Sequence, residues 1–462
     1  MSTYDAIVLG AGMAGIPLAM RLGYKDYKVA LIERAELGGT CLNRGCIPTK
    51  TLIASAKVAH HAREAERWGV VAENVGVDLA KVIARKDELV ASIRAGSERN
   101  VEQNENVTLL RGEARFTGDK TLTVNGQQVK GERVFINTGT RSFVPDLQGL
   151  DSISYLDSTT ALDLRELPTH LLIVGGGYIG VEFAQMFRRF GSDVTLVQRP
   201  AQLLPGEDAD IAHTLRTLLE GEGITVHTDT EAQRVTQEGD AVHLTVSSDQ
   251  TLTGSHLMLA AGRSPNTDVL NLAATGVETD AQGFIRINDR LETSAANVWA
   301  LGDVRGGAMF THTARDDARV VYQNVVKGES LSIKNRLTPY AVFSDPQLGR
   351  VGLNERQAKE AGHRLKLGSY KGKKVAKART LGEAYGLIKV IADADTNKLL
   401  GASVLMPKGA ELVHELGAAM QVGARYSDLA AMIHIHPTLS EGLSSALGGV
   451  HRAANDSGDQ DE

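Results

Sequence analysis

Short apolar runs, each followed by a glycine-rich turn and a helical pattern, recur along this chain of 462 residues. The first run covers 4–9, the glycine-rich turn covers 10–15, and apolar residues continue at helical spacing through Leu22. A second apolar run, at 28–32, ends at Glu33. A continuous apolar run bounded by turn residues is typical of a strand buried in a parallel sheet. The N-terminal pattern therefore predicts a strand, a tight turn, a helix and a second parallel strand.

A second unit of the same kind covers 171–197, with its glycine-rich turn at 175–180 and its helix at 181–190. Both turns read Gly-X-Gly-X-X-Gly, a dinucleotide fingerprint in which glycines let the backbone approach a pyrophosphate and the helix N-terminus stabilises its charge. Where Glu33 is placed to accept a hydrogen bond from a ribose hydroxyl, the second unit has Gln198. The sequence thus predicts two dinucleotide sites, built on Gly10, Gly12, Gly15, Gly175, Gly177 and Gly180.

Arg199 bears on the choice of nucleotide at the second site. Because position 198 lacks the acid that favours NAD, Arg199 is a candidate partner for the 2′-phosphate of NADP. An exposed arginine at a strand end is the ordinary alternative. The sequence leaves both interpretations open.

The pattern changes in the C-terminal part of the chain. The run at 298–301 is an apolar strand that ends at Gly302 and Asp303, and we expect it to rejoin the first domain. From about 337 onward, strand-like runs such as 387–391 and 399–405 precede a helix at 411–423. The predicted fold class is α/β, with two doubly wound, Rossmann-like nucleotide-binding domains and a C-terminal α+β domain.

The composition narrows the class of protein. Hydrophobic residues make up 42% of the chain and the net charge is −6, so a general attraction to nucleic acid or to an anionic membrane is not expected. No apolar run is long enough to span a bilayer. The apolar stretch at 6–20 lacks the basic leader of a signal peptide. We therefore expect a cytoplasmic enzyme with no nucleic-acid partner and no membrane partner.

The two cysteines of the chain, Cys41 and Cys46, are separated by only four residues. A disulfide across so short a loop removes little entropy from the unfolded chain, and a chain of this size has an ample core. Structural thiols are the alternative, and a zinc site would need further ligands nearby. We favour a redox-active dithiol.

The two fingerprints, the cysteine run and Leu301-Gly302-Asp303 together resemble the class I flavoprotein disulfide reductases, the pyridine nucleotide-disulfide oxidoreductases that include dihydrolipoamide dehydrogenase and mercuric reductase. The resemblance implies FAD at the first fingerprint, NADPH or NADH at the second, and a homodimer. It divides the chain into a FAD-binding domain with its first part at 1–149, a NAD(P)-binding domain at 150–267, a return to the FAD or central domain at 268–336, an interface or dimerisation domain at 337–452, and an acidic tail at 453–462 that we expect to be disordered.

The resemblance also implies roles for single residues. Cys46 would face the flavin as the thiolate while Cys41 attacks the oxidised substrate. Arg44 between them departs from the small apolar residue that is frequent in the family. It is a candidate for lowering the thiol pKa or for selecting an acidic substrate, and the alternative is that it is solvated. Lys50 and Glu182 match positions that meet beside the flavin, and the alternative is that both are surface charges. His436 would move protons, oriented by Glu441, and would reach the cysteines of the other subunit. Further cofactor contacts are implied at Glu33, Thr40, Lys50, Thr138, Gly139 and Asp303 for FAD, and at Arg199 and Gly262 for the nicotinamide nucleotide.

Three functions remain open. The leading one is an NAD(P)H-dependent FAD disulfide reductase that acts on a small disulfide such as lipoamide. The second is a reductase of Hg(II) or another metal ion, with Cys41 and Cys46 as the only metal ligands we name, because thiolates bind soft metal ions. A mercuric reductase usually adds a second cysteine pair, and this chain has no third cysteine. The third is a flavin-bearing redox sensor or scaffold with little turnover.

Overall fold

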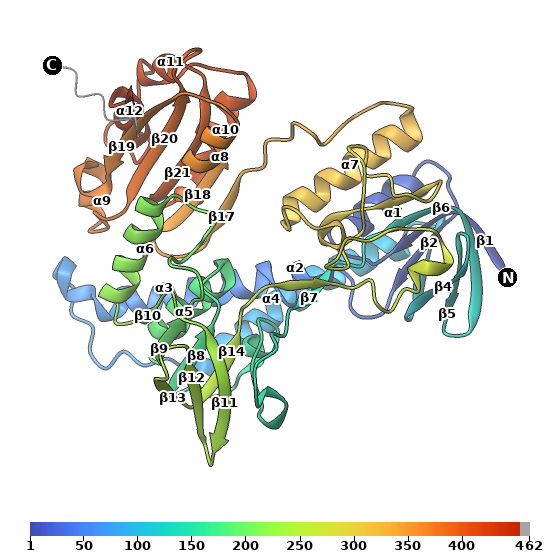
Figure 1. The fold of residues 1–462 in the computed structure, drawn as a ribbon, viewed down its shortest axis with the longest axis horizontal. Helices are drawn as coiled ribbons and strands as arrows, with labels where there is room; N and C mark the ends of the chain where they lie inside the picture. The colour runs from blue at the N-terminus through green and yellow to red at the C-terminus, as the bar shows by residue number, and fades with distance from the viewer. Residues whose placement is uncertain (453–462) are drawn as a thin grey trace.

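The computed structural model describes residues 1–452, which form two nucleotide-binding lobes and a separate C-terminal lobe (Figure 1). The predicted disordered tail at 453–462 lies outside the described residues. No helix within the described part of the chain is long and apolar enough to cross a membrane. The cytoplasmic location stays a prediction.

The first lobe is built on a seven-stranded sheet in the order β3-β2-β1-β6-β5-β4, with β16 paired to β6. Its strands are β1 (Ser2–Leu9), β2 (Val29–Glu33), β3 (Val107–Arg111), β4 (Ala114–Gly118), β5 (Thr121–Val124), β6 (Gln127–Ile136) and β16 (Val298–Ala300). Its helices are α1 (Gly15–Gly23), α2 (Gly39–Asn43), α3 (Cys46–Arg63), α4 (Leu79–Glu102) and α7 (Thr311–Lys327). β16 runs parallel to β6, so the chain returns to the first sheet at 298–300.

Side chains of β1 alternate between two separate parts of the core. Ala6 and Val8 pack into one hydrophobic cluster, whereas Ile7 and Leu9 pack into another on the opposite face of the sheet. Successive residues of a strand point to opposite faces, so this strand is buried on both sides. That double burial explains why the sequence shows a continuous apolar run there instead of alternation.

The second lobe repeats the arrangement with a parallel sheet in the order β10-β9-β8-β14 and an antiparallel sheet in the order β11-β12-β13. Its elements are β8 (His170–Val174), α5 (Tyr178–Phe190), β9 (Asp193–Val197), α6 (Ala209–Gly221), β10 (Thr225–His227), β11 (Ala232–Glu238), β12 (Ala241–Val246), β13 (Thr251–Gly254) and β14 (His256–Leu259). Two short antiparallel strands, β7 (Thr140–Ser142) and β15 (Arg263–Pro265), pair where the chain crosses between the two lobes.

The C-terminal lobe is a six-stranded antiparallel sheet in the order β17-β18-β21-β20-β19-β22, with helices packed on it. Its strands are β17 (Tyr340–Val342), β18 (Gln347–Gly352), β19 (Leu365–Lys371), β20 (Leu387–Asp393), β21 (Leu399–Met406) and β22 (His451–Arg452). Its helices are α8 (Glu355–Glu360), α9 (Ala376–Thr380), α10 (Gly409–Gln421), α11 (Tyr426–Ala430) and α12 (Glu441–Gly448). Short 3-10 turns elsewhere cover Ala65–Trp68, Leu150–Ser152, Thr160–Asp163, Leu272–Ala274, Gly302–Arg305 and Gly372–Lys374.

Candidate active site

The first and third glycines of each fingerprint are required by close backbone contacts. Gly10 and Gly175 have φ angles of +96° and +114°, where a side chain is strained, and a Cβ on either would lie within 2.4 Å of a neighbouring backbone oxygen. A Cβ on Gly15 would lie 1.9 Å from the carbonyl oxygen of Gly10, and one on Gly180 would lie 1.8 Å from that of Gly175. Both turns therefore close only with glycine at these positions.

The middle glycines face space that a ligand needs. A Cβ on Gly177 would meet no atom within 4 Å, and one on Gly12 would meet only a side-chain nitrogen at 3.3 Å. Both glycines lie just before a helix, α1 or α5, whose first backbone N–H groups have no partner within the helix. The two turns fit the pyrophosphate of a dinucleotide, because a side chain at either middle position would occupy that space.

Glu33 and Gln198 occupy equivalent places beneath the two turns. Glu33 Oε2 accepts a hydrogen bond of 2.7 Å from the backbone N–H of Ala11, and Gln198 Oε1 accepts one of 2.8 Å from that of Gly176. The second site thus keeps the hydrogen bond but loses the negative charge. Arg199 is 77% exposed beside it, with Nη1 3.6 Å from a carboxylate oxygen of Glu231.

Cys46 is the first residue of α3, and Cys41 lies within the short helix α2 just before it. Both are free thiols in the structure. A hydrogen bond with Cys41, another with Thr311 at 3.3 Å and the charge of Lys50 lower the pKa of Cys46 to about 6. The same bond with Cys46, together with burial, raises the pKa of Cys41. Near neutral pH the pair therefore carries one negative charge, which resides on Cys46.

Arg44 does not have the role that its position suggested. Its guanidinium forms an exposed ion pair of 2.8 Å with Glu36, and the charges that favour the thiolates belong to Lys50, for Cys46, and to Arg315, for Cys41. Sequence reasoning missed Arg315 as a contributor because α7 lies far along the chain from the cysteines.

Lys50 and Glu182 form an ion pair of 2.7 Å between α3 and α5. Glu182 is 6% exposed, so the alternative that it is a surface charge is wrong. Its second oxygen accepts a hydrogen bond of 2.9 Å from the backbone N–H of Phe343. Since Lys50 lies one helical turn beyond Cys46, the pair lies close to the dithiol, and its charges are among those that act on the Cys46 thiol.

The implied flavin contacts beyond the first fingerprint gather where the lobes meet. Thr138 and Gly139 accept hydrogen bonds of 2.9 and 3.0 Å from Asn266, which follows β15. Burial raises the pKa of Asp303, and one of its oxygens accepts a hydrogen bond of 3.3 Å from the Thr140 hydroxyl. Thr40 is exposed on α2, and Gly262 adopts a φ of +140° just before β15.

His436 lies apart from the cysteines of its own chain. It precedes α12 in the C-terminal lobe, whereas α2 and α3 lie in the middle of the molecule (Figure 1). Its Nδ1 is 2.8 Å from a carboxylate oxygen of Glu441, and its side chain is 71% exposed. The other oxygen of Glu441 accepts a bond from the backbone N–H of Thr438, which with His436 lowers the pKa of Glu441. His434 is separate and faces Glu415.

Comparison with known proteins agrees with this geometry. The family model described as pyridine nucleotide-disulphide oxidoreductase matches residues 4–318, and the model of its dimerisation domain matches 338–447. The chain belongs to the pyridine nucleotide-disulphide oxidoreductase family. The resemblance seen in the sequence and the predicted fold class are therefore confirmed, including the antiparallel dimerisation domain at the C-terminus. Members of this family are flavoproteins that use FAD, NAD(P) and a redox-active disulfide.

Relatives within the family carry different names. A dihydrolipoyl dehydrogenase of Thermus scotoductus is 39% identical over 98% of this chain and 99% of its own. A mercuric reductase of Lysinibacillus sphaericus is 35% identical over 96% of this chain and 82% of its own. A solved Cu(II) complex of the HOCl-induced flavoprotein disulfide reductase RclA from Escherichia coli matches with a TM-score of 0.89 and 36% identity, over 97% of this chain and 99% of that one.

Because the chain has only two cysteines, carbon-13-labelled cysteine gives two Cβ resonances in the reduced protein. We expect the Cys46 resonance to titrate with a midpoint near pH 6 and the Cys41 resonance to stay that of a thiol through neutral pH. Cys41→Ala removes the largest cause of the lowered pKa, so the Cys46 midpoint should rise toward the ordinary value of about 8.5. A midpoint that does not move in Cys41→Ala would contradict the assigned cause.

Proposed function

We propose that this protein is an FAD-dependent NAD(P)H:disulfide oxidoreductase that passes electrons to or from a small disulfide such as lipoamide. The observation that carries the proposal is the Cys46 thiol at the start of α3, with its lowered pKa, beside both Cys41 and the Lys50–Glu182 pair. Family membership supports the cofactors. Bound FAD would supply a carrier that takes a hydride from the nicotinamide and delivers two electrons to the Cys41–Cys46 disulfide, which becomes the dithiol.

The residues that would hold the cofactors follow from the fit of the two turns. The first turn would hold FAD, together with Glu33, Thr40, Lys50, Thr138, Gly139 and Asp303. The second turn would hold the nicotinamide nucleotide, together with Arg199 and Gly262. Lys50 and Glu182 would stand where the two ligands meet, because they join the helices that follow the cysteines and the second fingerprint.

The dithiol can exchange with a disulfide in two steps. Cys41, once deprotonated, attacks one sulfur of the substrate, so that a mixed disulfide forms and the substrate S–S bond breaks. The Cys46 thiolate then attacks Cys41, which releases the second substrate sulfur and leaves the Cys41–Cys46 disulfide. His436 of the second subunit, held by Glu441, would accept the Cys41 proton and donate it to the leaving thiolate.

The C-terminal lobe supports a homodimer. Ile433 and Ile435 are 96% and 80% exposed and lie just before His436 in the chain. Large apolar side chains exposed together mark interaction surfaces. A matching dimerisation-domain model supports the same conclusion. Contact through this surface would bring His436 of one subunit to the cysteines of the other.

Replacement of His436 tests the proton transfer. In His436→Gln we expect disulfide reduction to slow by about 10²–10⁴-fold near neutral pH, the usual contribution of an acid–base group, while flavin reduction by NADPH keeps its rate. His434→Gln is the matched control, since His434 faces Glu415 instead. Unchanged turnover of the His436 variant across neutral pH would rule out the acid–base role.

NADPH is the proposed donor because Gln198 is neutral and Arg199 is exposed beside it. Arg199→Ala should raise the KM for NADPH about tenfold or more, since a hydrogen bond to a charged group contributes about 1.5–3 kcal/mol, and should leave the KM for NADH nearly unchanged. Steady-state kinetics with both donors measures the difference. Glu231→Gln is a useful control, because it removes the acid that faces Arg199 and should not weaken NADPH binding. Equal changes for both donors would contradict the assignment.

Reduction of a soft metal ion is the second candidate. Mercuric reductases lie among the relatives at 33–35% identity, and the similar solved structure of RclA is a Cu(II) complex. Thiolates are ligands that such ions prefer, and Cys41 and Cys46 would bind the ion as substrate. With no third cysteine in this chain, the same dithiol would both receive and reduce it.

Rapid mixing of the anaerobic, NADPH-reduced protein with lipoamide, or with thiol-buffered Hg(II), distinguishes these functions. We expect repeated flavin reoxidation by lipoamide, because Cys41 can attack a small disulfide, and slow reoxidation by the metal ion. Turnover with Hg(II) and almost none with lipoamide would favour the metal-ion reductase. Flavin that is bound but consumes negligible NADPH with any acceptor would favour the redox sensor or scaffold.

A further inference from the structure

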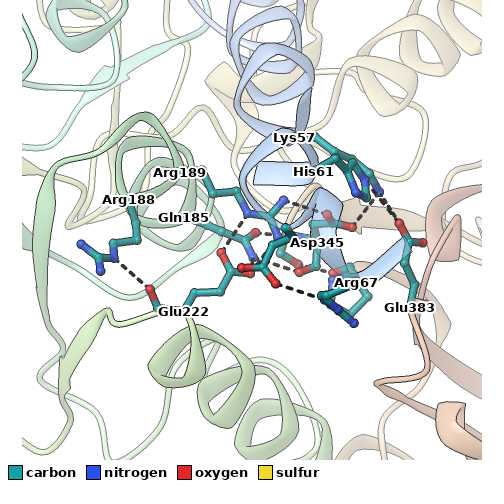
Figure 2. Close-up of polar contacts among 12 residues, drawn as sticks. Lys57, His61, Arg67, Gln185, Arg188, Arg189, Glu222, Asp345 and Glu383 are labelled. Carbon is teal, nitrogen blue, oxygen red and sulfur yellow. Dashed lines mark hydrogen bonds and ion pairs between the residues drawn. The ribbon is translucent and has the colours of Figure 1, made fainter. Parts of the chain in front are cut away.

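A polar cluster that includes Lys57, Arg189 and Asp345 joins all three lobes (Figure 2). Helix α3 contributes Lys50 and, seven residues later, Lys57, while α5 contributes Glu182 and, seven residues later, Arg189. Seven residues make about two helical turns, so each helix presents these side chains along one stripe. The loop at 343–346, between β17 and β18 of the C-terminal lobe, contacts both stripes.

Asp345 is the centre of this cluster. Its backbone N–H donates to Gln185 Oε1 at 2.7 Å, and its carbonyl accepts from Gln185 Nε2 at 2.9 Å. Its two carboxylate oxygens accept from Lys57 at 3.0 Å and from Arg189 at 2.7 Å. Both Asp345 and Arg189 are buried. One residue of the C-terminal lobe is therefore fixed by four bonds to α3 and α5.

Phe343, two residues before Asp345, is the residue that reaches the proposed hydride-transfer pair. Its backbone N–H donates to Glu182 Oε1 at 2.9 Å, and its ring centroid lies 4.7 Å from Lys50 Nζ. One carboxylate oxygen of Glu182 thus pairs with Lys50, and the other accepts the hydrogen bond from the backbone of Phe343 in the loop. A shift of the loop would move both members of the pair, since the ammonium is also attracted to the ring face.

Packing holds the two ends of this loop, because Val342 before it and Leu348 after it are buried in the hydrophobic core. Between them lies a partly open pocket of about 120 Å³, whose lining includes Lys57, Gln185 and Asp345. The polar contacts of Asp345 therefore hold the middle of the loop, where packing leaves space.

We propose that Asp345 is a positioning residue for flavin reduction: it anchors the loop of the dimerisation domain whose Phe343 N–H and ring set the Lys50–Glu182 pair. This inference rests on the proposed function, in which that pair stands where the hydride is transferred. In this proposal neither Asp345 nor Gln185 touches the reacting atoms, and their effect on flavin reduction is transmitted through Phe343.

Asp345→Asn tests the inference with little risk to folding. Arg189 keeps its bonds of 2.7 and 2.8 Å to Glu222, and Lys57 keeps Glu383 at 3.3 Å, so no buried charge is left without a partner. Gln185→Leu is the second variant, because it removes both backbone bonds to Asp345 without a change of charge. Glu383→Gln is the matched control: it removes a partner of Lys57 and has no contact with Phe343.

Two measurements are made on the flavin-loaded variants. Stopped-flow mixing with NADPH should show flavin reduction slowed about tenfold or more in Asp345→Asn and in Gln185→Leu, since small misplacements of a reacting geometry cost large rate factors. Glu182→Gln serves as the reference for direct loss of the Lys50–Glu182 ion pair. Reoxidation of the reduced Asp345→Asn and Gln185→Leu variants by the disulfide substrate should keep its wild-type rate. Amide hydrogen exchange of segment 341–347 should rise in both variants and stay unchanged in Glu383→Gln.

The outcomes separate the two proposals. Wild-type rates of flavin reduction in Asp345→Asn, equal slowing of both half-reactions, or unchanged exchange protection at 341–347 would each overturn the positioning role. If wild-type flavin is reduced by neither NADPH nor NADH, the proposed function fails, and the exchange measurement still reports whether Asp345 anchors the loop.

Discussion

The contact between α3 and α5 is the constraint on which the arrangement of this molecule depends. Each helix belongs to a different nucleotide-binding lobe. Helix α3 begins at Cys46 of the dithiol, and α5 begins within the second fingerprint. The ion pair of Lys50 and Glu182 ties them at 2.7 Å. Glu182 is buried whereas Lys50 is partly exposed, so loss of the lysine would leave a buried carboxylate without its charged partner. Together with the apolar core that α3 and α5 share, the pair fixes how the two lobes face each other.

The asymmetry of the two thiols follows from the same helix. Cys46 lies at the positive end of the α3 dipole, one turn from Lys50, whereas Cys41 lies in a short helix with no such end facing it. A single hydrogen bond between the sulfurs then lowers the pKa of Cys46 and raises the pKa of Cys41, since it stabilises the thiolate of Cys46 and the protonated form of Cys41. A difference in pKa between two identical side chains thus comes from position alone.

The sequence predicted the elements around both turns well because those elements are buried on two faces and their glycines leave no alternative. It also indicated Lys50, Glu182, His436 and Glu441, but only through resemblance, since nothing local distinguishes them from surface charges. The roles of these four residues stay proposals. Asp345 was missed, because its partners lie 156 or more residues away. A signal was present on α5: Glu182, Gln185 and Arg189 share one stripe of a helix that is otherwise largely apolar and buried.

That polar stripe joins the domains at a cost in desolvation, because burying a charge costs several kcal/mol per ion and the attraction between paired charges has to offset it. An apolar stripe would bind the lobes as firmly, but it would fix no angle or register between them. Arg189 instead makes one directed bond across the junction, to Asp345, and two within its own lobe, to Glu222, while Gln185 adds two across the junction to the backbone of Asp345. Directed bonds define orientation as well as distance. Because the dimerisation domain supplies Asp345 as well as the proposed proton carrier His436, the proposed function gives this domain a part on the hydride side of its own subunit and on the thiol side of the other.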